Sequence, residues 1–195
     1  MDEQIERRAF PVSMEVRRSD ASPPKIRGHA AVFDRLSEDL GGFRERIRPG
    51  AFTKTLQEAD VRALFNHDPM HVLGRTKSGT LTLREDGEGL AFEVEPPDAE
   101  WARALAVSIE RGDVDQASFA FRTVKDRFTE EAGGTVRELL EVQLYDVSPV
   151  TYPAYTQTSV EVRSADPAER LLRASRLMQA VDQFKRLAMA GRDRI

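Results

Sequence analysis

Apolar and polar side chains alternate with a period of two along most of the first three quarters of the chain, and this pattern limits the possible folds more than any other feature. In the segment 114–124, Ala117, Phe119 and Phe121 fall on one face of an extended chain while Ser118 falls on the other. The same alternation predicts strands in seven segments: 8–16, 26–33, 61–65, 80–83, 90–94, 114–124 and 136–150.

The connections between these strands are predicted from glycine, proline and charge. Residues 34–48 are polar and contain glycines, which predicts a loop, and the charged run 125–134 predicts a long hairpin turn. Gly28 lies inside a predicted strand, where it indicates a bulge or a close backbone approach. His29 beside it has no acidic neighbour in sequence, and we expect it to have a structural role.

Three helices are predicted. Asp166 is followed by proline and then by a glutamate three residues after the cap, which favours a helix start there, and apolar residues then recur at helical spacing. We therefore expect a domain at 1–163 and an amphipathic helical tail at 164–195. The two shorter helices are expected at 52–59 and around Trp101, Leu105 and Ile109, the latter between an N-cap at Asp98 and a stop near Gly112.

Composition excludes several classes of function. The 195 residues include no cysteine, which excludes thiol catalysis, cysteine zinc sites and disulfides, and fits an intracellular protein. With 29 basic and 33 acidic residues, the chain lacks the excess of positive charge that is typical of proteins that bind nucleic acid. No apolar run is long enough to span a membrane, and the charged start does not resemble a signal peptide. We expect neither nucleic acid nor membrane as a partner, and no cofactor.

A histidine, His67, follows the end of the predicted strand 61–65. The sequence NHDP follows the strand, and we expect Pro69 to stop the ladder so that His67 lies at the tip of a buried element. A metal site from His67 and His71 would need a helix to bring both rings onto one ion, and Pro69 between them disfavours that helix. No metal is therefore expected.

A second interpretation joins His67 to a serine and a carboxylate. A serine hydroxyl needs a base within hydrogen-bond reach, and the base needs an acceptor on its other nitrogen. Ser118 is the candidate nucleophile, and Asp146, predicted on the same strand face as the apolar Val142 and Leu144, is a better orienting group than Asp68, whose side chain would point away from its neighbour. In a third interpretation all these residues have structural roles only. Without further information, we rank this interpretation above the other two.

A series of motifs changes that order. In sequence they are GHAAVFD, RPGAF, LFNHD, VLGRT, DGEGLAFE, the run 113–121 that leads into SFAF, and YDVSPVTYPAY. Across nearly all of residues 8–160 the chain resembles the tailed-phage prohead (capsid maturation) serine protease family, which is distantly akin to the herpesvirus assemblins. The resemblance implies an α+β fold, a mostly antiparallel closed β-barrel flanked by helices.

The resemblance also implies a serine endopeptidase that trims scaffold and major capsid protein segments, and itself, inside the prohead in the cytoplasm of a bacterial host. By motif position, the family's catalytic histidine matches His67, its serine matches Ser118 and its acidic residue matches Asp146. Glu141 is the alternative for the third member of this catalytic triad. Ala120 stands where the family often has glycine, and neither this change nor Pro149 removes a catalytic group.

The sequence itself also offers candidates for the oxyanion donors and a role for the tail. Gly74 and Arg75 follow the histidine strand and are candidate oxyanion donors. The tail 164–195 is expected to target or self-associate, and to be removed by self-cleavage near residues 163–165. The alternative function is a non-catalytic capsid assembly or scaffold-binding factor, for which we expect Ser118 and His67 to lie far apart.

Overall fold

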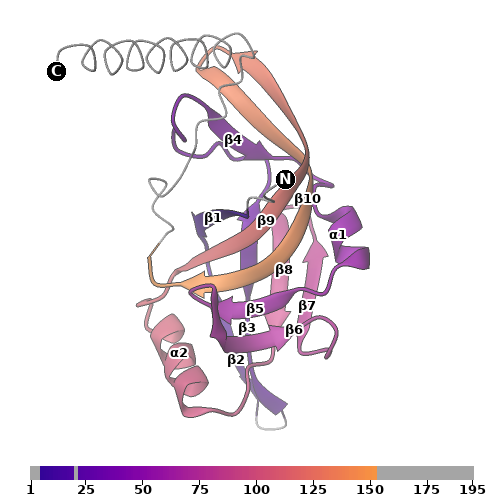
Figure 1. Cartoon of the computed structure of the whole chain (residues 1–195). Helices are drawn as coiled ribbons and strands as arrows, with labels where there is room; N and C mark the ends of the chain where they lie inside the picture. The colour runs from indigo at the N-terminus through magenta and orange to yellow at the C-terminus, as the bar shows by residue number, and fades with distance from the viewer. Residues whose placement is uncertain (1–4, 20–21, 153–195) are drawn as a thin grey trace, which may run out of the picture. The chain divides into compact units, whose positions relative to one another are not determined.

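Strands dominate the described part of the chain, as the alternating pattern predicts. The structure is a computed structural model, and it describes residues 5–19 and 22–152 (Figure 1). The strands are β1 (Glu6–Pro11), β2 (Glu15–Ser19), β3 (Ser22–Val32), β4 (Arg44–Ile47), β5 (Arg62–Phe65), β6 (Asp68–Arg75), β7 (Leu81–Glu85), β8 (Gly89–Val94), β9 (Gln116–Glu131) and β10 (Gly134–Val150). The helices are α1 (Thr53–Glu58) and α2 (Glu100–Glu110).

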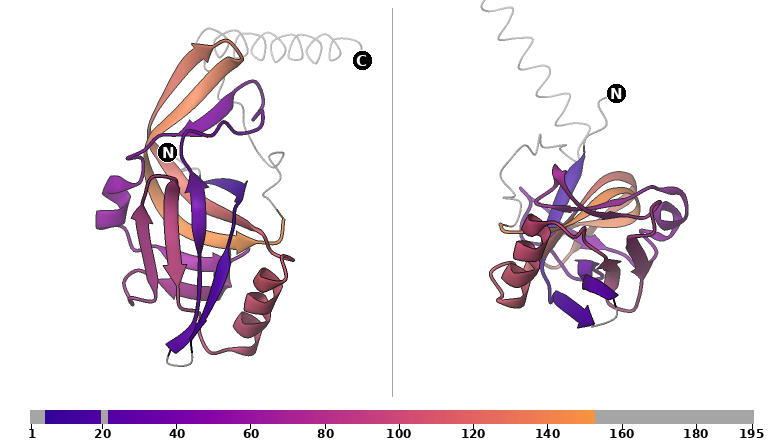
Figure 2. Two further views of the ribbon diagram at one scale, coloured as in Figure 1. Left: turned by 180° about the vertical axis from the view of Figure 1, so that it is seen from behind. Right: turned by 90° about the horizontal axis from the view of Figure 1, so that it is seen from below.

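The strands form two sheets. The six-stranded sheet has the order β1-β9-β10-β5-β6, with β4 paired to β10, and the four-stranded sheet has the order β2-β3-β8-β7. Most pairs are antiparallel, but β4 and β5 both run parallel to β10. Seen from behind, the four-stranded sheet lies in front of the six-stranded sheet (Figure 2, left).

A closed barrel is not found among the described residues, so this part of the expected fold is corrected. The predicted strand 8–16 is broken into β1 and β2, and the chain passes from one sheet to the other at residues 12–14. The N–H of Val12 donates to the carbonyl of Asp115 at 3.2 Å, which extends the pairing of β1 with β9 by one residue before the chain crosses to the other sheet. The sheets therefore keep separate edges.

The predicted hairpin turn at 125–134 is wrong, because most of it is strand. β9 and β10 continue through this segment, and Figure 1 shows the pair extending beyond the rest of the six-stranded sheet. The charged residues of this segment resemble those of a loop because the side chains on β9 from Val124 to Phe128 are exposed. The predicted loop 34–48 likewise contains β4, which pairs with the same extension.

Helix α2 forms where the helical spacing predicts, but its predicted cap is wrong. Its N-cap is Ala99, without a side-chain hydrogen bond, and Asp98 instead pairs with Arg103. Gly112 follows the helix with a φ of 78°, which suits a glycine at the C-terminus. Among the buried residues of α2 are Leu105 and Ile109, whereas Trp101 is partly buried at the edge of the core.

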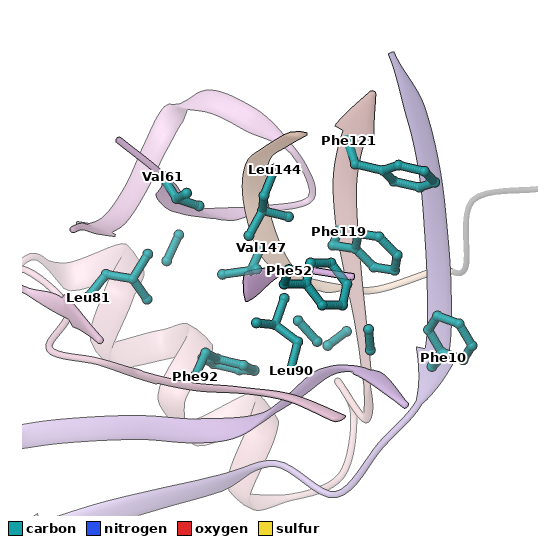
Figure 3. Packing of buried hydrophobic residues seen from close by; sticks show 14 of the residues in the cluster. Phe10, Phe52, Val61, Leu81, Leu90, Phe92, Phe119, Phe121, Leu144 and Val147 are labelled. Atoms are coloured by element: carbon teal, nitrogen blue, oxygen red, sulfur yellow. The ribbon is translucent and has the colours of Figure 1, made fainter. Parts of the chain in front are cut away.

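Aromatic rings fill the centre of the core (Figure 3). Phe119 of β9 lies 6.3 Å from Phe10, 5.5 Å from Phe52 and 4.8 Å from Phe121, measured between ring centroids. Phe52, Phe119 and Phe121 are each 0 % exposed. Because Ser118 and Ala120 alternate with Phe119 and Phe121, a rigid apolar strand face holds the serine side of β9 in place.

The expected C-terminal helix and the boundary between 1–163 and 164–195 lie outside the described residues. Among the residues that are described, no helix is long and apolar enough to cross a membrane.

Candidate functional site

The two central strands of the large sheet bring the predicted serine and carboxylate side by side. On β9, Ser118 stands opposite Ser148 of β10 in the antiparallel register. Ala120 stands opposite Asp146 in the same register. Because opposed residues point to the same side of a sheet, Ser118, Ser148 and Asp146 all lie on the face away from the aromatic core.

A β-bulge sets the face of Asp146. Val142 and Leu144 belong to the apolar core, and the register shifts between Leu144 and Asp146, where Tyr145 has no partner on β9. This extra residue turns Asp146 to the face of Ala120. The prediction that Asp146 shares a face with Val142 and Leu144 is therefore wrong, because strict alternation fails at the bulge.

His67 lies in a two-residue turn between β5 and β6. Asn66 and His67 have φ values of 54° and 56°, and Phe65 and Asp68 pair on either side of them. Two consecutive left-handed residues are typical of a type I′ hairpin turn, whose twist suits antiparallel strands. The prediction that Pro69 stops the ladder is wrong: it lies within β6, an edge strand whose pairing is irregular at this point.

Asn66 fastens this turn to the end of β10. Its N–H donates to the Pro149 carbonyl at 3.0 Å, and its side-chain oxygen accepts the Thr151 N–H at 2.9 Å. Its side-chain amide nitrogen lies 3.3 Å from the Thr151 hydroxyl. These bonds hold the neighbouring His67 over the strands that carry Ser118 and Asp146.

The imidazole of His67 bridges the serine and the carboxylate. Its Nε2 lies 2.7 Å from Ser118 Oγ, and its Nδ1 lies 2.6 Å from Asp146 Oδ1. Because a carboxylate only accepts, Nδ1 carries the proton and Nε2 is free to accept the Ser118 hydroxyl proton. A hydroxyl, an imidazole and a carboxylate in this chain of contacts have the geometry that nucleophilic catalysis needs.

Ser148 is a site residue that the sequence analysis missed. Its hydroxyl donates to Asp146 Oδ1 at 2.7 Å, and its Oγ lies 3.3 Å from His67 Nδ1. It is 1 % exposed. The two-residue spacing from Asp146 on one strand was the available signal, since such residues share a face.

The side chains of the site are largely buried. Ser118 is 0 % exposed and Asp146 is 8 % exposed, and the His67 side chain is 8 % exposed. In a setting with little water, hydrogen bonds among these groups are electrostatically stronger than at the surface.

His71 and Asp68 pair with each other and not with this site. His71 Nδ1 lies 2.7 Å from Asp68 Oδ2, and the ring meets Trp101 edge-on with centroids 5.0 Å apart. A hydrogen bond from the Met70 backbone N–H and one from the His71 side chain lower the pKa of Asp68. Within 5–19 and 22–152, no group of three potential metal ligands is found.

Glu141, the alternative third member, lies elsewhere. Its carboxylate is 3.3 Å from Lys54 Nζ, and it stands opposite Lys125 on β9, on the far side of the bulge from Asp146. The contacts of His67 therefore favour Asp146 over Glu141 as its partner.

The contacts of Gly74 and Arg75 give no support for an oxyanion role. The Arg75 guanidinium is paired with Asp60, and the backbone N–H of Arg75 donates to Thr80 Oγ1 at 3.0 Å. A Cβ on Gly74 would lie 2.5 Å from Val94 Cγ2, so this glycine allows close packing of the two sheets.

His29 has an acidic partner that is distant in sequence. Its Nε2 lies 3.0 Å from Asp86 Oδ2, in the β7–β8 connection. Burial by itself would raise the pKa of Asp86, but N–H donors from Glu88 and Gly89 together with His29 lower it to about 2. A Cβ on Gly28 would lie 3.0 Å from the Ser13 carbonyl, which confirms the predicted close approach.

Known proteins resemble the chain in both sequence and fold. A family model described as Caudovirus prohead serine protease matches residues 12–171. The structure of the bacteriophage T4 capsid assembly protease, gp21, aligns with a TM-score of 0.51 and 11 % identity, covering 75 % of this chain and 97 % of the other. No curated protein matches the sequence. Because the family model spans more than half of the residues, the chain belongs to the Caudovirus prohead serine protease family.

Proposed function

We propose that this protein is a serine endopeptidase in which Ser118 is the nucleophile, His67 the general base and Asp146 the group that orients His67. The observation that carries the proposal is the imidazole of His67, with one nitrogen 2.7 Å from Ser118 Oγ and the other 2.6 Å from Asp146 Oδ1. Ser148 is a poorer nucleophile candidate, because its hydroxyl faces Asp146 and Nδ1 rather than the free nitrogen.

The proposed reaction has two halves. Ser118 Oγ attacks the peptide carbonyl while His67 Nε2 takes its proton, and the resulting imidazolium is stabilised by Asp146. His67 then gives that proton to the departing amine, which leaves an acyl group on Ser118. Water, deprotonated by His67, attacks the acyl carbonyl, and the serine regains its proton as the carboxylate product leaves.

Membership of the prohead protease family supports scaffold and major capsid protein segments as substrates. Cleavage would then take place inside an assembling prohead in the cytoplasm of the bacterial host. We extend the proposal to self-cleavage and to self-association, because a protease enclosed with its substrates at high concentration meets its own chain. No cofactor enters the proposed steps.

Co-expression of the full chain with its cognate capsid protein tests the proposal, with cleavage products identified by mass spectrometry. We expect cleavage by the natural chain and none by Ser118→Ala or His67→Ala. The matched control is Ser78→Ala, which removes the hydroxyl of an exposed loop serine and should leave cleavage unchanged. Undiminished cleavage by Ser118→Ala would overturn the nucleophile assignment.

The non-catalytic assembly factor gives a different pattern in the same experiment. It predicts that Ser118→Ala and the natural chain incorporate equally into shells and that neither yields cleaved capsid protein. The short Ser118–His67 contact favours the protease, because an assembly factor has no need to keep that geometry.

The residues after 163 are proposed to act separately from the protease domain. We propose that 164–195 targets the protein to the shell. A chain ending at residue 163 should keep the thermal unfolding of the domain and its cleavage in solution, but lose incorporation into shells. Normal incorporation of the shortened chain would refute this.

A further inference from the structure

We propose that Ser148 is a positioning residue that holds Asp146 and the tautomer of His67; this inference rests on the function proposed above. The hydroxyl of Ser148 and Nδ1–H of His67 converge on the same oxygen, Asp146 Oδ1, at 2.7 Å and 2.6 Å. A carboxylate oxygen that receives two donors has little freedom to rotate.

The position of Ser148 gives its oxygen two tasks. Its proton is committed to Asp146, so its lone pairs face His67 Nδ1 at 3.3 Å. His67 Nδ1–H therefore has two acceptors on one side, Asp146 and Ser148. Both favour the tautomer with its proton on Nδ1, which leaves Nε2 free for Ser118.

The burial of Ser148 makes its hydrogen bond matter. Ser148 is 1 % exposed, and the side chain of its acceptor Asp146 is 11 % exposed. Because the pair is largely buried, we expect removal of the hydroxyl to leave the carboxylate with one donor fewer. The register also fixes the residue, because Ser148 lies directly opposite Ser118 across the β9–β10 ladder.

The bulge in β10 explains why this residue is available. Beyond Tyr145, Asp146 and Ser148 point to the same face as Ser118, and Val147 between them points into the core. If Ser148 only stabilised the fold, its hydroxyl could donate its hydrogen bond to any nearby acceptor. Here its acceptor is the carboxylate that orients the proposed base.

Kinetics of capsid-segment cleavage separate a positioning role from a structural one. We expect Ser148→Ala to lower kcat by about 10- to 100-fold with KM within about twofold, because a hydrogen bond to a charged group is lost. Ser148→Cys keeps a weak donor of similar size and should fall between the natural chain and Ser148→Ala.

The matched control is Thr123→Val. The Thr123 hydroxyl also donates to a partly buried carboxylate, Glu6, at 2.6 Å, but this pair lies farther along β9 and does not contact His67. Thr123→Val should lower the thermal midpoint without changing kcat.

Nitrogen NMR of His67 in the full chain gives a readout that is independent of turnover. In the natural chain we expect Nδ1 protonated, and in Ser148→Ala a measurable fraction with the proton on Nε2. An unchanged tautomer together with an unchanged kcat in a folded Ser148→Ala chain would overturn the positioning role. Activity that survives Ser118→Ala would instead overturn the proposed function.

Discussion

The two ends of the β9–β10 pair are built from the same kind of ladder but are stabilised in opposite ways. At the inner end, 116–121 and 144–150, side chains are buried on both faces, with phenylalanines on one and the Ser118 site on the other. At the outer end, 124–138, many of the side-chain contacts are ion pairs, although Phe128 packs against Phe43 and Val136 is buried. A buried, closely packed end holds its side chains in fixed positions, whereas exposed ion pairs add little to stability and leave the outer end less rigidly held.

The outer end is not entirely solvated. Arg137, with a side chain 12 % exposed, reaches Glu6 at 2.7 Å, Glu45 at 3.1 Å and Asp126 at 2.7 Å. Glu45 also accepts from Arg8 of β1 at 2.7 Å. This network ties β1 and β4 to the pair, and β1 in turn lies beside Ser118, since Ala9 is its partner. The network therefore joins β1 and β4 to the outer end of the pair.

The largest expected contrast is between two carboxylates on β10. Asp146→Asn should lower kcat by about 10³- to 10⁴-fold, because an amide can donate to His67 and favours the wrong tautomer. Glu141→Gln breaks only the pair with Lys54 and should change kcat by less than about twofold. Steady-state cleavage measures both, and equal losses would show that contact with His67 does not set Asp146 apart from Glu141.

Two phenylalanines of β9 give the next contrast. Phe119→Ala should lower the free energy of unfolding by about 3–5 kcal/mol, because it leaves a cavity among packed rings. Phe128 packs edge-on against Phe43 and is 43 % exposed. Phe128→Ala should therefore lower the free energy of unfolding by less than about 1 kcal/mol. Urea unfolding of both variants checks the ratio, and similar losses would mean that the outer end is as tightly packed as the inner one.

The charge network predicts a dependence on pH. Burial alone would raise the pKa of Glu6, but hydrogen bonds and charge from Arg137, with smaller contributions from Thr123 and Arg8, lower it to about 2 from 4.5. A lowered pKa means that the carboxylate stabilises the fold above pH 4.5 and that this contribution is lost as the pH falls toward 2.

Glu6→Gln removes that contribution. The variant should be less stable than the natural chain at pH 7, by at most about 3 kcal/mol, and the difference should shrink steadily below about pH 4. Glu15→Gln is the control, since its carboxylate is 57 % exposed beside Arg27 and should cost less than about 1 kcal/mol. A difference for Glu6→Gln that grows on acidification would contradict the network.

The smallest effect is expected at the turn that carries His67. Asn66→Ala places alanine at a φ of 54° and removes both side-chain bonds to Thr151, which should cost about 1–2 kcal/mol and lower kcat about tenfold as His67 becomes less fixed. Asn66→Asp keeps the acceptor for the Thr151 N–H and the tolerance for this backbone, so it should retain more activity. Equal kcat for the two variants would show that the turn does not position His67.

The alternation of apolar and polar residues predicted most of the strands correctly, and it failed only at local irregularities. It predicted β7, β8 and the inner part of β9, and the motifs pointed to Ser118, His67 and Asp146, which the structure brings into contact. It failed at Tyr145, because a bulge changes no composition yet reverses every face beyond it. Ser148 shares the face of Asp146 because the two are two residues apart on β10, but its contact with Asp146 is seen only in the structure.

The remaining errors came from charge. The outer strands of the β9–β10 pair were predicted as a turn because exposed strand residues and loop residues have the same composition. Only cross-strand partners such as Glu138 for Arg127 and Asp126 for Arg137 show that these charges form a ladder.

The sequence by itself determined that this is a strand-rich chain without cysteine chemistry, that a histidine follows β5, and to which family the chain belongs, since these depend on local pattern and motif order. The tertiary structure decided which groups touch. The bulge at Tyr145, the left-handed turn at His67 and the pairing of Ser118 with Ser148 depend on register between distant strands. That register is fixed by core packing, which no local pattern of residues encodes.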